Sequence, residues 1–244
     1  MSNSPLISAT LISPNKTSPR NHKIDTVTIH CFVGNWELNK MLNLFKPQSF
    51  KASCNYVIDK DGKIGLCVEE KDRSWCSSNR ENDHRAITIE CASDVTHPYA
   101  INDAVYNSLV TLLVDICKRN PGIGKLRWKA DKGLIGKTNL QNMTVHRWFA
   151  NKACPGDYIY ARLGKIANEV NEKLENKTTA KSFRVRAKNV NLFKVPGEQP
   201  IGKNTGEGIF TIEEVKMAPD PTLIEWGRLR SGLGWIPLKD TTKL

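Results

Sequence analysis

The sequence predicts an α/β domain, with a central mixed β-sheet flanked by helices, followed by a small all-β barrel. Three observations predict this arrangement. Short alternating apolar segments are interleaved with longer segments of helical periodicity up to about residue 175. A polar stretch without apolar periodicity follows over residues 175–181. Beyond it only short strand-like segments and turn residues occur. We therefore expect two domains, residues 1–175 and 182–244.

Alternation of apolar and polar residues predicts the strands of the first domain. Residues 26–30 and 86–90 share one pattern, a half-buried strand that ends on a polar side chain. Residues 55–59 and 63–68 are expected to pair as a hairpin. Gly62 lies between them and supplies the positive φ that a tight turn requires.

Two segments have the spacing of amphipathic helices. The first begins after Asn102, a plausible N-cap, and its apolar positions are Val105, Leu109, Leu112, Leu113 and Ile116. The second begins at Asp157, and its apolar positions are Ile159, Leu163, Ile166, Val170 and Leu174. Five short strands are expected in the second domain, at residues 183–185, 190–193, 209–215, 224–229 and 234–238.

Composition and charge limit the classes of partner. No apolar run approaches the ~20 residues that span a bilayer, so we expect no membrane insertion. Residues 1–21 lack the basic and apolar regions of a signal peptide, which predicts synthesis in the cytoplasm. The net charge of +11 indicates an anionic partner, either nucleic acid or a polymer such as the Gram-positive wall. No nucleic-acid-binding motif is evident, so we expect no nucleic-acid partner.

The cysteines predict thiols and not a disulfide framework. Their number, 7, is odd, their spacings are scattered, and no export signal accompanies them. Cys31, Cys67, Cys91 and Cys117 lie in apolar strand or helix patterns and are expected to be buried. Cys154 differs because it lies in a polar loop marked by Pro and Gly.

One His and one Cys in that loop are candidate metal ligands. His146 and Cys154 are too few for a site, and His30, at the end of a predicted strand, is the natural third donor. Two neutral imidazoles and one thiolate would leave the fourth position of a zinc ion open for water, which is the catalytic arrangement.

Hydrolysis at such a centre also needs a proton carrier and a cation beside the developing oxyanion. Glu90 and Lys152 have the right chemistry, because Glu90 ends a neighbouring strand and Lys152 precedes Cys154 by two residues. Spacing alone leaves a structural role open for each of these side chains.

Four segments, in this order, carry a family resemblance: residues 27–30 (VTIH), 53–62 (SCNYVIDKDG), 87–90 (ITIE) and 144–156 (TVHRWFANKACPG). Together they resemble the type-2 N-acetylmuramoyl-L-alanine amidases, which include many phage endolysins and the peptidoglycan recognition proteins. The resemblance covers roughly residues 8–174. It implies a hydrolase that acts on bacterial peptidoglycan and cuts the amide bond between N-acetylmuramic acid and L-alanine.

The resemblance also implies roles for particular residues. One zinc ion would be held by His30, His146 and Cys154, and it would activate the attacking water. The catalytic glutamate of the family falls on Glu90, and its oxyanion-stabilising lysine falls on Lys152.

The chain departs from this pattern at one position, because some members carry a catalytic tyrosine where Cys54 stands here. Tyr56, two residues further on, is expected in the core, and we assign the acid–base role to the glutamate. Trp75, Asn79 and Trp148 are predicted to contact substrate in the cleft.

The second domain resembles the bacterial Src homology 3-like domains that are appended to cell-wall hydrolases. Residues 189–194 (NVNLFK), 208–212 (GIFTI) and 226–236 (WGRLRSGLGWI) carry the resemblance. It implies a wall-binding role. Trp226 and Trp235 are expected either to fill the core of the barrel or to contact the ligand.

Other functions are weighed against the amidase. A non-catalytic peptidoglycan-binding protein would share the fold, but the thiolate ligand Cys154 favours catalysis. A cysteine peptidase of the wall would place its Cys at a helix N-terminus with the His later in the chain, whereas here His146 comes first and Pro155 follows the Cys. The absence of a signal peptide favours a phage or prophage endolysin that acts at the wall after release. The sequence does not indicate whether the protein is a monomer or an oligomer.

Overall fold

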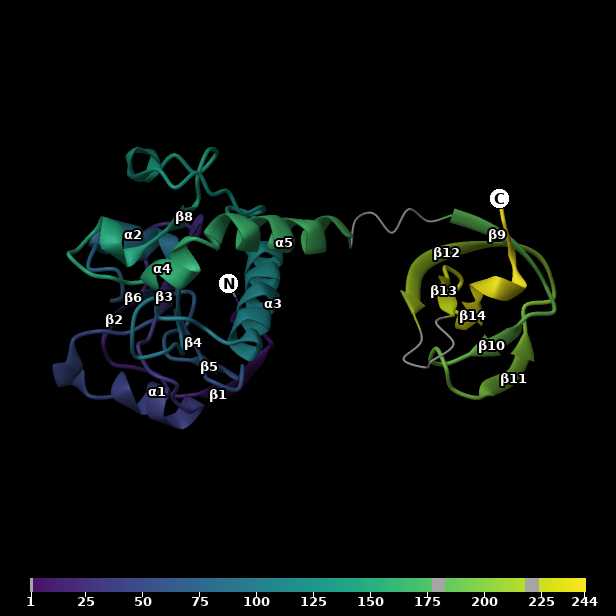
Figure 1. Ribbon diagram of the computed structural model, residues 1–244, viewed down its shortest axis with the longest axis horizontal. Coiled ribbons are helices and arrows are strands. Elements are labelled where there is room, and N and C mark those ends of the chain that lie inside the picture. Colours follow the sequence, from purple (N-terminus) through teal and green to yellow (C-terminus); the bar gives the residue numbers. More distant parts are fainter. Residues whose placement is uncertain (1, 177–182, 218–223) are drawn as a thin grey trace. The chain divides into compact units, whose positions relative to one another are not determined.

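The computed structural model describes residues 2–176, 183–217 and 224–244. The chain divides into two compact units, Met1–Leu174 and Glu175–Leu244 (Figure 1). The first two residues of the predicted polar stretch 175–181 continue the last helix of the first unit. The remainder of that stretch lies outside the described residues.

The first unit contains a six-stranded mixed sheet of order β1-β5-β4-β7-β3-β8. Its strands are β1 (Ile7–Thr10), β3 (Thr26–Cys31), β4 (Tyr56–Ile58), β5 (Ile64–Leu66), β7 (Ala86–Cys91) and β8 (Met143–Thr144). β4, β7, β3 and β8 run parallel to one another, whereas β5 is antiparallel to β4 and parallel to β1. This confirms the predicted mixed sheet, and the edge strands β1 and β8 add to it. A separate pair joins β2 (Lys16–Thr17) to β6 (Arg73–Ser74).

Helices cover this sheet on both sides. They are α1 (Leu38–Leu44), α2 (Arg80–Arg85), α3 (Asp103–Arg119), α4 (Gly156–Tyr160) and α5 (Leu163–Asn176). In Figure 1, α3 lies on one side of the strands, and α2 and α4 lie on the other. The predicted cap of α3 is confirmed, because the side chain of Asn102 accepts the N–H of Val105 at 3.0 Å. No helix in the described part of the chain has the length and apolar character needed to cross a membrane.

The prediction of one continuous helix from Asp157 to Leu174 is wrong. The structure has α4 and α5 with a break between them, although Ile159 and Leu163 are both buried as the periodicity predicts. The N–H of Arg162 bonds to the carbonyl of Ile159 at 2.9 Å, an i to i+3 contact that tightens the chain at the break. Apolar spacing indicates which residues face the core. A tight turn between two helices leaves that spacing nearly unchanged, so the spacing does not reveal the break.

The hairpin of β4 and β5 forms as predicted. Gly62 has φ +82°, and the carboxylate of Asp59 accepts the backbone N–H groups of Asp61 and Lys63 at 2.9 and 2.8 Å. A Cβ at Gly62 would lie 2.8 Å from the carbonyl oxygen of Ala104 at the start of α3. Glycine is therefore required both by the turn and by the close approach of the helix.

The cysteines and Tyr56 occupy the core as the sequence predicts. The four cysteines expected to be buried are at most 6% exposed, and all seven are free thiols. Tyr56 is fully buried, and its hydroxyl donates to the carboxylate of Glu70 at 2.6 Å. It is thus held in a structural hydrogen bond.

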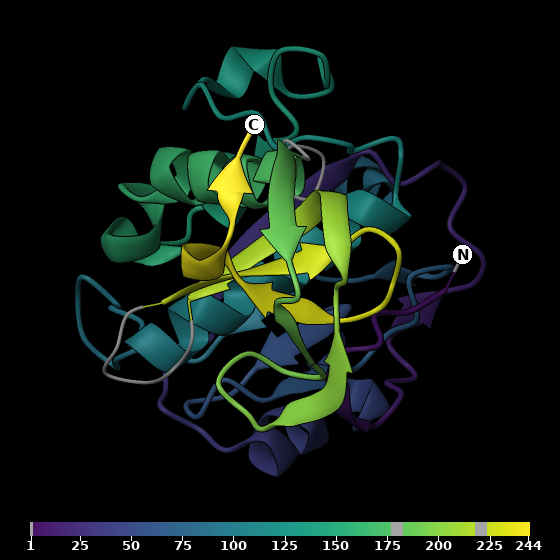
Figure 2. The same ribbon diagram turned by 90° about the vertical axis from the view of Figure 1, so that its right-hand side faces the viewer.

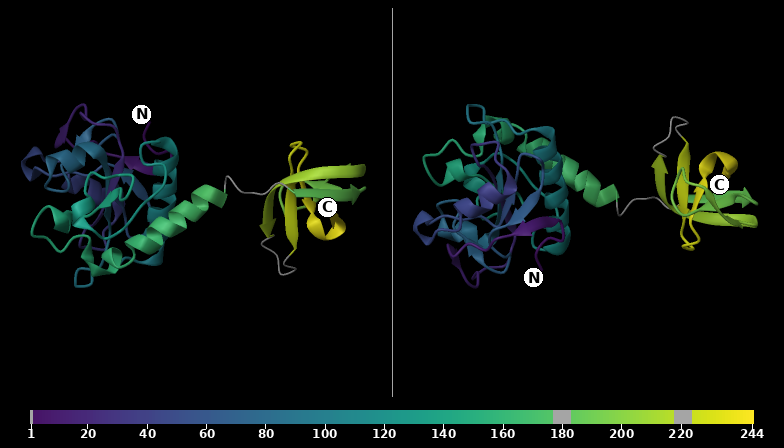
Figure 3. Two further views of the ribbon diagram at one scale, coloured as in Figure 1. Left: turned by 90° about the horizontal axis from the view of Figure 1, so that it is seen from above. Right: turned by 90° about the horizontal axis from the view of Figure 1, so that it is seen from below.

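The second unit is a seven-stranded antiparallel sheet of order β11-β10-β14-β13-β12-β9-β15. Its strands are β9 (Phe183–Lys188), β10 (Asn191–Phe193), β11 (Pro200–Asn204), β12 (Glu207–Met217), β13 (Glu225–Leu229), β14 (Trp235–Pro237) and β15 (Thr242–Lys243). Each of the five predicted strands overlaps one of these, and β11 and β15 are additional. Figures 2 and 3 show the strands from further sides, with the yellow turn η4 (Leu238–Asp240) against β13. Trp226 and Trp235 are 5% and 7% exposed and form a small cluster with Phe193.

Candidate active site with two histidines and a thiol

The parallel pairing of β3 and β7 places His30 beside Glu90. The two residues are direct register partners, so their side chains leave the sheet on the same face. His30 is fully buried, and its Nδ1 lies 3.8 Å from Oε1 of Glu90. These two residues, near the carboxyl ends of their strands, form what we term the floor of the site.

His146 and Cys154 come from the loop that follows β8, the neighbour of β3. His146 begins the turn η3 (His146–Trp148), and the chain then returns so that the carbonyl of Cys154 accepts the N–H of Arg147 at 3.0 Å. The Cys154 Sγ lies 3.3 Å from His30 Nδ1, and the two imidazole centroids are 5.2 Å apart. One donor atom from each of the three side chains lies within 4.8 Å of the other two. The structure therefore brings the three predicted ligands together.

Burial favours the neutral form of both imidazoles. It lowers the pKa of His30 to about 3, with a smaller contribution from His146. The pKa of His146 is also lowered, first by burial and then by the positive charge of Lys152. Neutral imidazoles keep a lone pair for a metal ion at physiological pH.

The thiol and the carboxylate respond to burial in the opposite direction. Burial raises the pKa of Cys154, and the neighbouring thiol of Cys31 adds to this. It raises the pKa of Glu90 to about 8, with a further contribution from Cys31. A divalent cation between these groups would favour their charged forms, so the donor set has an environment that a cation would stabilise.

Two buried polar atoms of the floor have no hydrogen-bond partner in the part of the chain that the structure describes. They are Nε2 of His30 and Oε2 of Glu90. Unpaired buried polar atoms are costly and concentrate at functional sites. Oε2 of Glu90 is therefore available for a hydrogen bond to a bound molecule.

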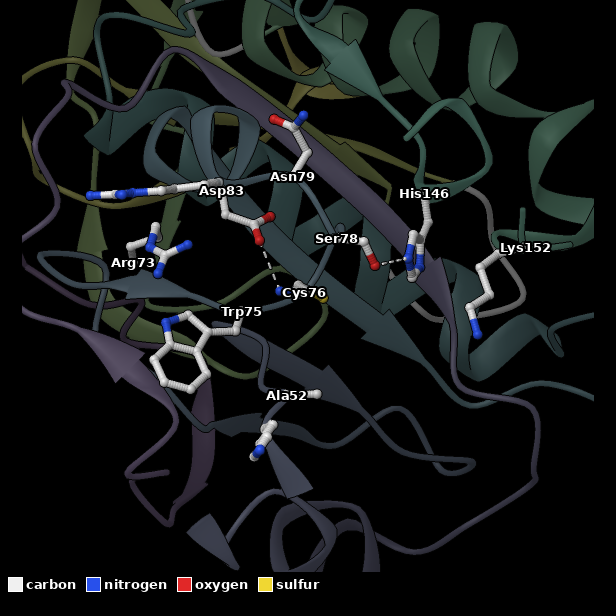
Figure 4. A pocket seen from close by; sticks show the side chains of 11 residues that line it. Ala52, Arg73, Trp75, Cys76, Ser78, Asn79, Asp83, His146 and Lys152 are labelled. Carbon is white, nitrogen blue, oxygen red and sulfur yellow. Dashed lines mark hydrogen bonds between the residues drawn. The ribbon is translucent and has the colours of Figure 1, made fainter. Parts of the chain in front are cut away.

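A pocket of about 530 Å³ opens beside His146 (Figure 4). Its lining includes His146, Lys152, and two of the predicted substrate contacts, Trp75 and Asn79. Most of its other charged side chains are basic: Lys51, Arg73 and Arg80, with Asp83 as the acidic exception. The pocket therefore favours a substrate that carries negative charge.

The third predicted substrate contact lies elsewhere. Trp148 is 9% exposed and stacks on Trp128, with ring centroids 5.1 Å apart and planes 6° from parallel. It is not among the residues that line the pocket. Its contact with substrate stays a prediction.

Sequence reasoning missed two residues of this site. The Cys76 thiol lies 3.8 Å from Oε1 of Glu90, and Ser78 Oγ lies 2.9 Å from Nε2 of His146. A signal was available, because both residues fall between Trp75 and Asn79, the predicted substrate contacts. Neither residue type indicated a role by itself.

Fold and site together define an α/β protein with a candidate metal centre of three donors, the number typical of catalytic zinc sites. The sequence profile described as N-acetylmuramoyl-L-alanine amidase matches residues 20–157, which is more than half of the chain. The chain belongs to this family. The matched range contains all three candidate ligands together with Glu90 and Lys152, and it leaves the second unit uncovered.

Solved structures align with about two thirds of this chain. A selenomethionine derivative of AmpD is 20% identical, with a TM-score of 0.50 over 68% of this chain and 96% of that chain. The endolysin N-acetylmuramoyl-L-alanine amidase LysCS from Clostridium intestinale is 18% identical, with a TM-score of 0.48 over 69% and 99% of the two chains. The Ph2119 endolysin from a Thermus scotoductus bacteriophage is 14% identical, with a TM-score of 0.46 over 62% and 89%. Among curated proteins, no sequence matches the chain significantly.

Proposed function

We propose that the chain is a zinc-dependent N-acetylmuramoyl-L-alanine amidase that hydrolyses the bond between N-acetylmuramic acid and L-alanine in bacterial peptidoglycan. The convergence of His30, His146 and Cys154 carries the proposal. These residues are up to 124 positions apart in the sequence, yet their candidate donor atoms all lie within 4.8 Å of one another. Membership of the amidase family supports the choice of reaction.

The donor chemistry supports zinc as the resident metal. Imidazole nitrogens and a thiolate are preferred zinc ligands, and three protein ligands are typical of catalytic sites. When bound, zinc supplies Lewis-acid chemistry, acidifying a coordinated water and polarising a carbonyl oxygen.

Glu90 is the proposed proton carrier. Its Oε1 faces His30 and Cys76, whereas Oε2 is without a partner among the described residues. Oε2 would accept the proton of the attacking water and return it to the amine of the L-alanine leaving group. The sheet pairing of β7 with β3 supports this role, because it holds the carboxylate beside the proposed ligand His30.

Lys152 is the proposed oxyanion stabiliser. It lines the pocket beside His146, and it forms no ion pair with any described residue. Its ammonium group is thus free to face the oxygen on which charge develops as the amide is attacked. Trp75 and Asn79 are proposed substrate contacts, because they line the same pocket.

Digestion of purified walls tests this function. We expect new free L-alanine amino termini without new reducing sugars, and loss of both activity and bound zinc after treatment with a chelator. Wall binding without new amino termini would instead establish a non-catalytic peptidoglycan-binding protein. Activity that resists chelators and is lost on thiol blocking would establish a cysteine peptidase.

The second unit is a proposed Src homology 3-like wall-binding domain, and the whole protein a proposed phage or prophage endolysin that acts at the wall after release. The small antiparallel sheet and its Trp226–Trp235 cluster support the first assignment. A chain ended at residue 176 should bind walls more weakly and cleave a soluble muropeptide at the rate of the full chain. Equal retention of both proteins on walls would contradict the binding role.

A further inference from the structure

Ser78 combines an unfavourable backbone conformation with a contact to a candidate metal ligand. Its φ is +61°, in the left-handed region that non-glycine residues seldom occupy. Its Oγ lies 2.9 Å from Nε2 of His146, and Figure 4 shows this contact at the wall of the pocket. Residues held in such conformations concentrate at functional sites, where the surrounding structure fixes them.

The neighbours of Ser78 explain how the conformation is maintained. On one side, the N–H of Ser77 donates to the carboxylate of Asp83 at 3.1 and 3.2 Å. On the other, the side chain of Asn79 caps helix α2 by accepting the N–H of Asn82 at 2.8 Å. Both flanks are fixed by separate contacts, so the residue between them is constrained to the turn that directs its side chain towards His146.

A buried polar network sets the distance between this turn and two strands: β3, which carries His30, and β8, which leads into His146. The amide nitrogen of Asn82 donates to the hydroxyls of Ser77 and Thr28, at 3.1 and 3.0 Å, and its oxygen accepts the hydroxyl of Thr144 at 2.9 Å. Thr28 and Thr144 also contact each other at 2.8 Å. Each lies two residues before one of the two histidines. The Ser78 hydroxyl is therefore located relative to the site by the fold.

We infer that Ser78 is a positioning residue for the metal centre: its hydroxyl oxygen accepts Nε2–H of His146 and so presents Nδ1 of that ring to the metal. A neutral imidazole carries one N–H, and the nitrogen without it is the one that binds a metal. A hydrogen bond to the other nitrogen fixes ring orientation and tautomer. This inference rests on the proposed function.

In the competing arrangement the metal binds Nε2 of His146. The metal and the Ser78 hydroxyl would then compete for that nitrogen. Removal of the hydroxyl would then leave zinc affinity unchanged or increase it. The two arrangements therefore predict opposite results for the same substitution.

The test uses the full chain, freed of metal, with Ser78→Ala and Ser78→Gly. Zinc affinity is measured by competition with a chromophoric chelator, and the thermal midpoint is measured without metal. We expect both variants to bind zinc about 10-fold more weakly or worse. Ser78→Gly should also raise the metal-free midpoint by about 2–4 °C, because glycine accepts positive φ.

Ala130→Gly is the matched control. Ala130 has φ +57° in an exposed segment and does not line the pocket. This substitution should raise the midpoint in the same way and leave zinc affinity unchanged. A purely structural role for Ser78 would move midpoint and affinity together, whereas the positioning role moves them in opposite directions in Ser78→Gly.

The outcomes separate the inference from the function on which it rests. If the unaltered chain binds zinc and Ser78→Ala binds it within twofold, the positioning role is wrong and the amidase proposal stands. If the unaltered chain binds no zinc, both are wrong.

Discussion

The site has two halves that are held in different ways. The floor residues His30 and Glu90 stand on β3 and β7, whose parallel pairing is continuous from Thr26–Ala86 to Cys31–Cys91. The rim, which we define as His146, Lys152 and Cys154, belongs to the segment between β8 and α4.

Local backbone hydrogen bonds within the loop, together with the side chain of Arg147, hold the rim in place. The guanidinium of Arg147 donates to the carboxylate of Asp157 at 2.9 Å and to the carbonyl of Ala153, on both sides of Cys154. Floor substitutions should therefore remove a chemical group from an intact scaffold, whereas rim substitutions should also alter ligand geometry. The predictions below test this difference, from the largest expected effect to the smallest.

His30→Ala should abolish wall lysis and zinc binding, because it removes the buried candidate ligand beside which both other candidate donors lie. The secondary structure should be retained, which circular dichroism can check. Measurable zinc binding at the affinity of the unaltered chain would exclude His30 as a ligand.

Glu90→Gln should lower kcat by about 10²–10⁴-fold, the usual contribution of a general base. Zinc affinity should change little, because glutamine keeps the shape of the side chain beside His30. Wall digestion and chelator competition measure the two quantities. A variant with full activity would remove Glu90 from the proton-carrying role.

Lys152→Met should lower kcat by about 10²–10³-fold, as expected for loss of one oxyanion-stabilising group. Because Lys152 is on the exposed rim and pairs with no described carboxylate, the thermal midpoint should be unchanged. Steady-state kinetics on a soluble muropeptide would show the loss in kcat; a change confined to KM would assign Lys152 to substrate binding alone.

Arg147→Met should weaken zinc binding by about 10-fold, since it frees the loop that carries Cys154. Arg127→Met is the matched control, because Arg127 also donates to backbone carbonyls and lies outside the pocket lining. Equal effects of the two substitutions on zinc affinity would show that the contacts of Arg147 do not hold the rim in place.

Asp157→Asn should have a small effect that depends on pH. Hydrogen bonds from His97 and then from Arg147 lower the pKa of Asp157 in the folded protein. A carboxylate with a lowered pKa stabilises the fold above its unfolded pKa, ~3.9, and this contribution disappears as the pH falls through the folded value. The midpoints of the two proteins should differ at neutral pH and converge in acid. A constant difference would show that the charge of Asp157 is not its cause.

The sequence by itself determined the family and much of the fold. Apolar periodicity predicted the mixed sheet with its flanking helices, because alternation and helical spacing report which face is buried. Residue type and the family resemblance predict His30, His146 and Cys154 as the metal ligands, since few side chains are good zinc ligands. The break after α4 was missed because a tight turn preserves the same apolar spacing.

Only the tertiary structure decided which of these groups meet. The order β7-β3-β8 and the register of His30 with Glu90 bring together residues that are far apart in the chain. The turn before α2 places Cys76 beside Glu90 and Ser78 beside His146, and neither residue type nor spacing predicted these contacts. The physical reason is that local patterns encode period and burial, whereas contacts across long sequence separations depend on strand order, register and the side-chain networks that fix the loops.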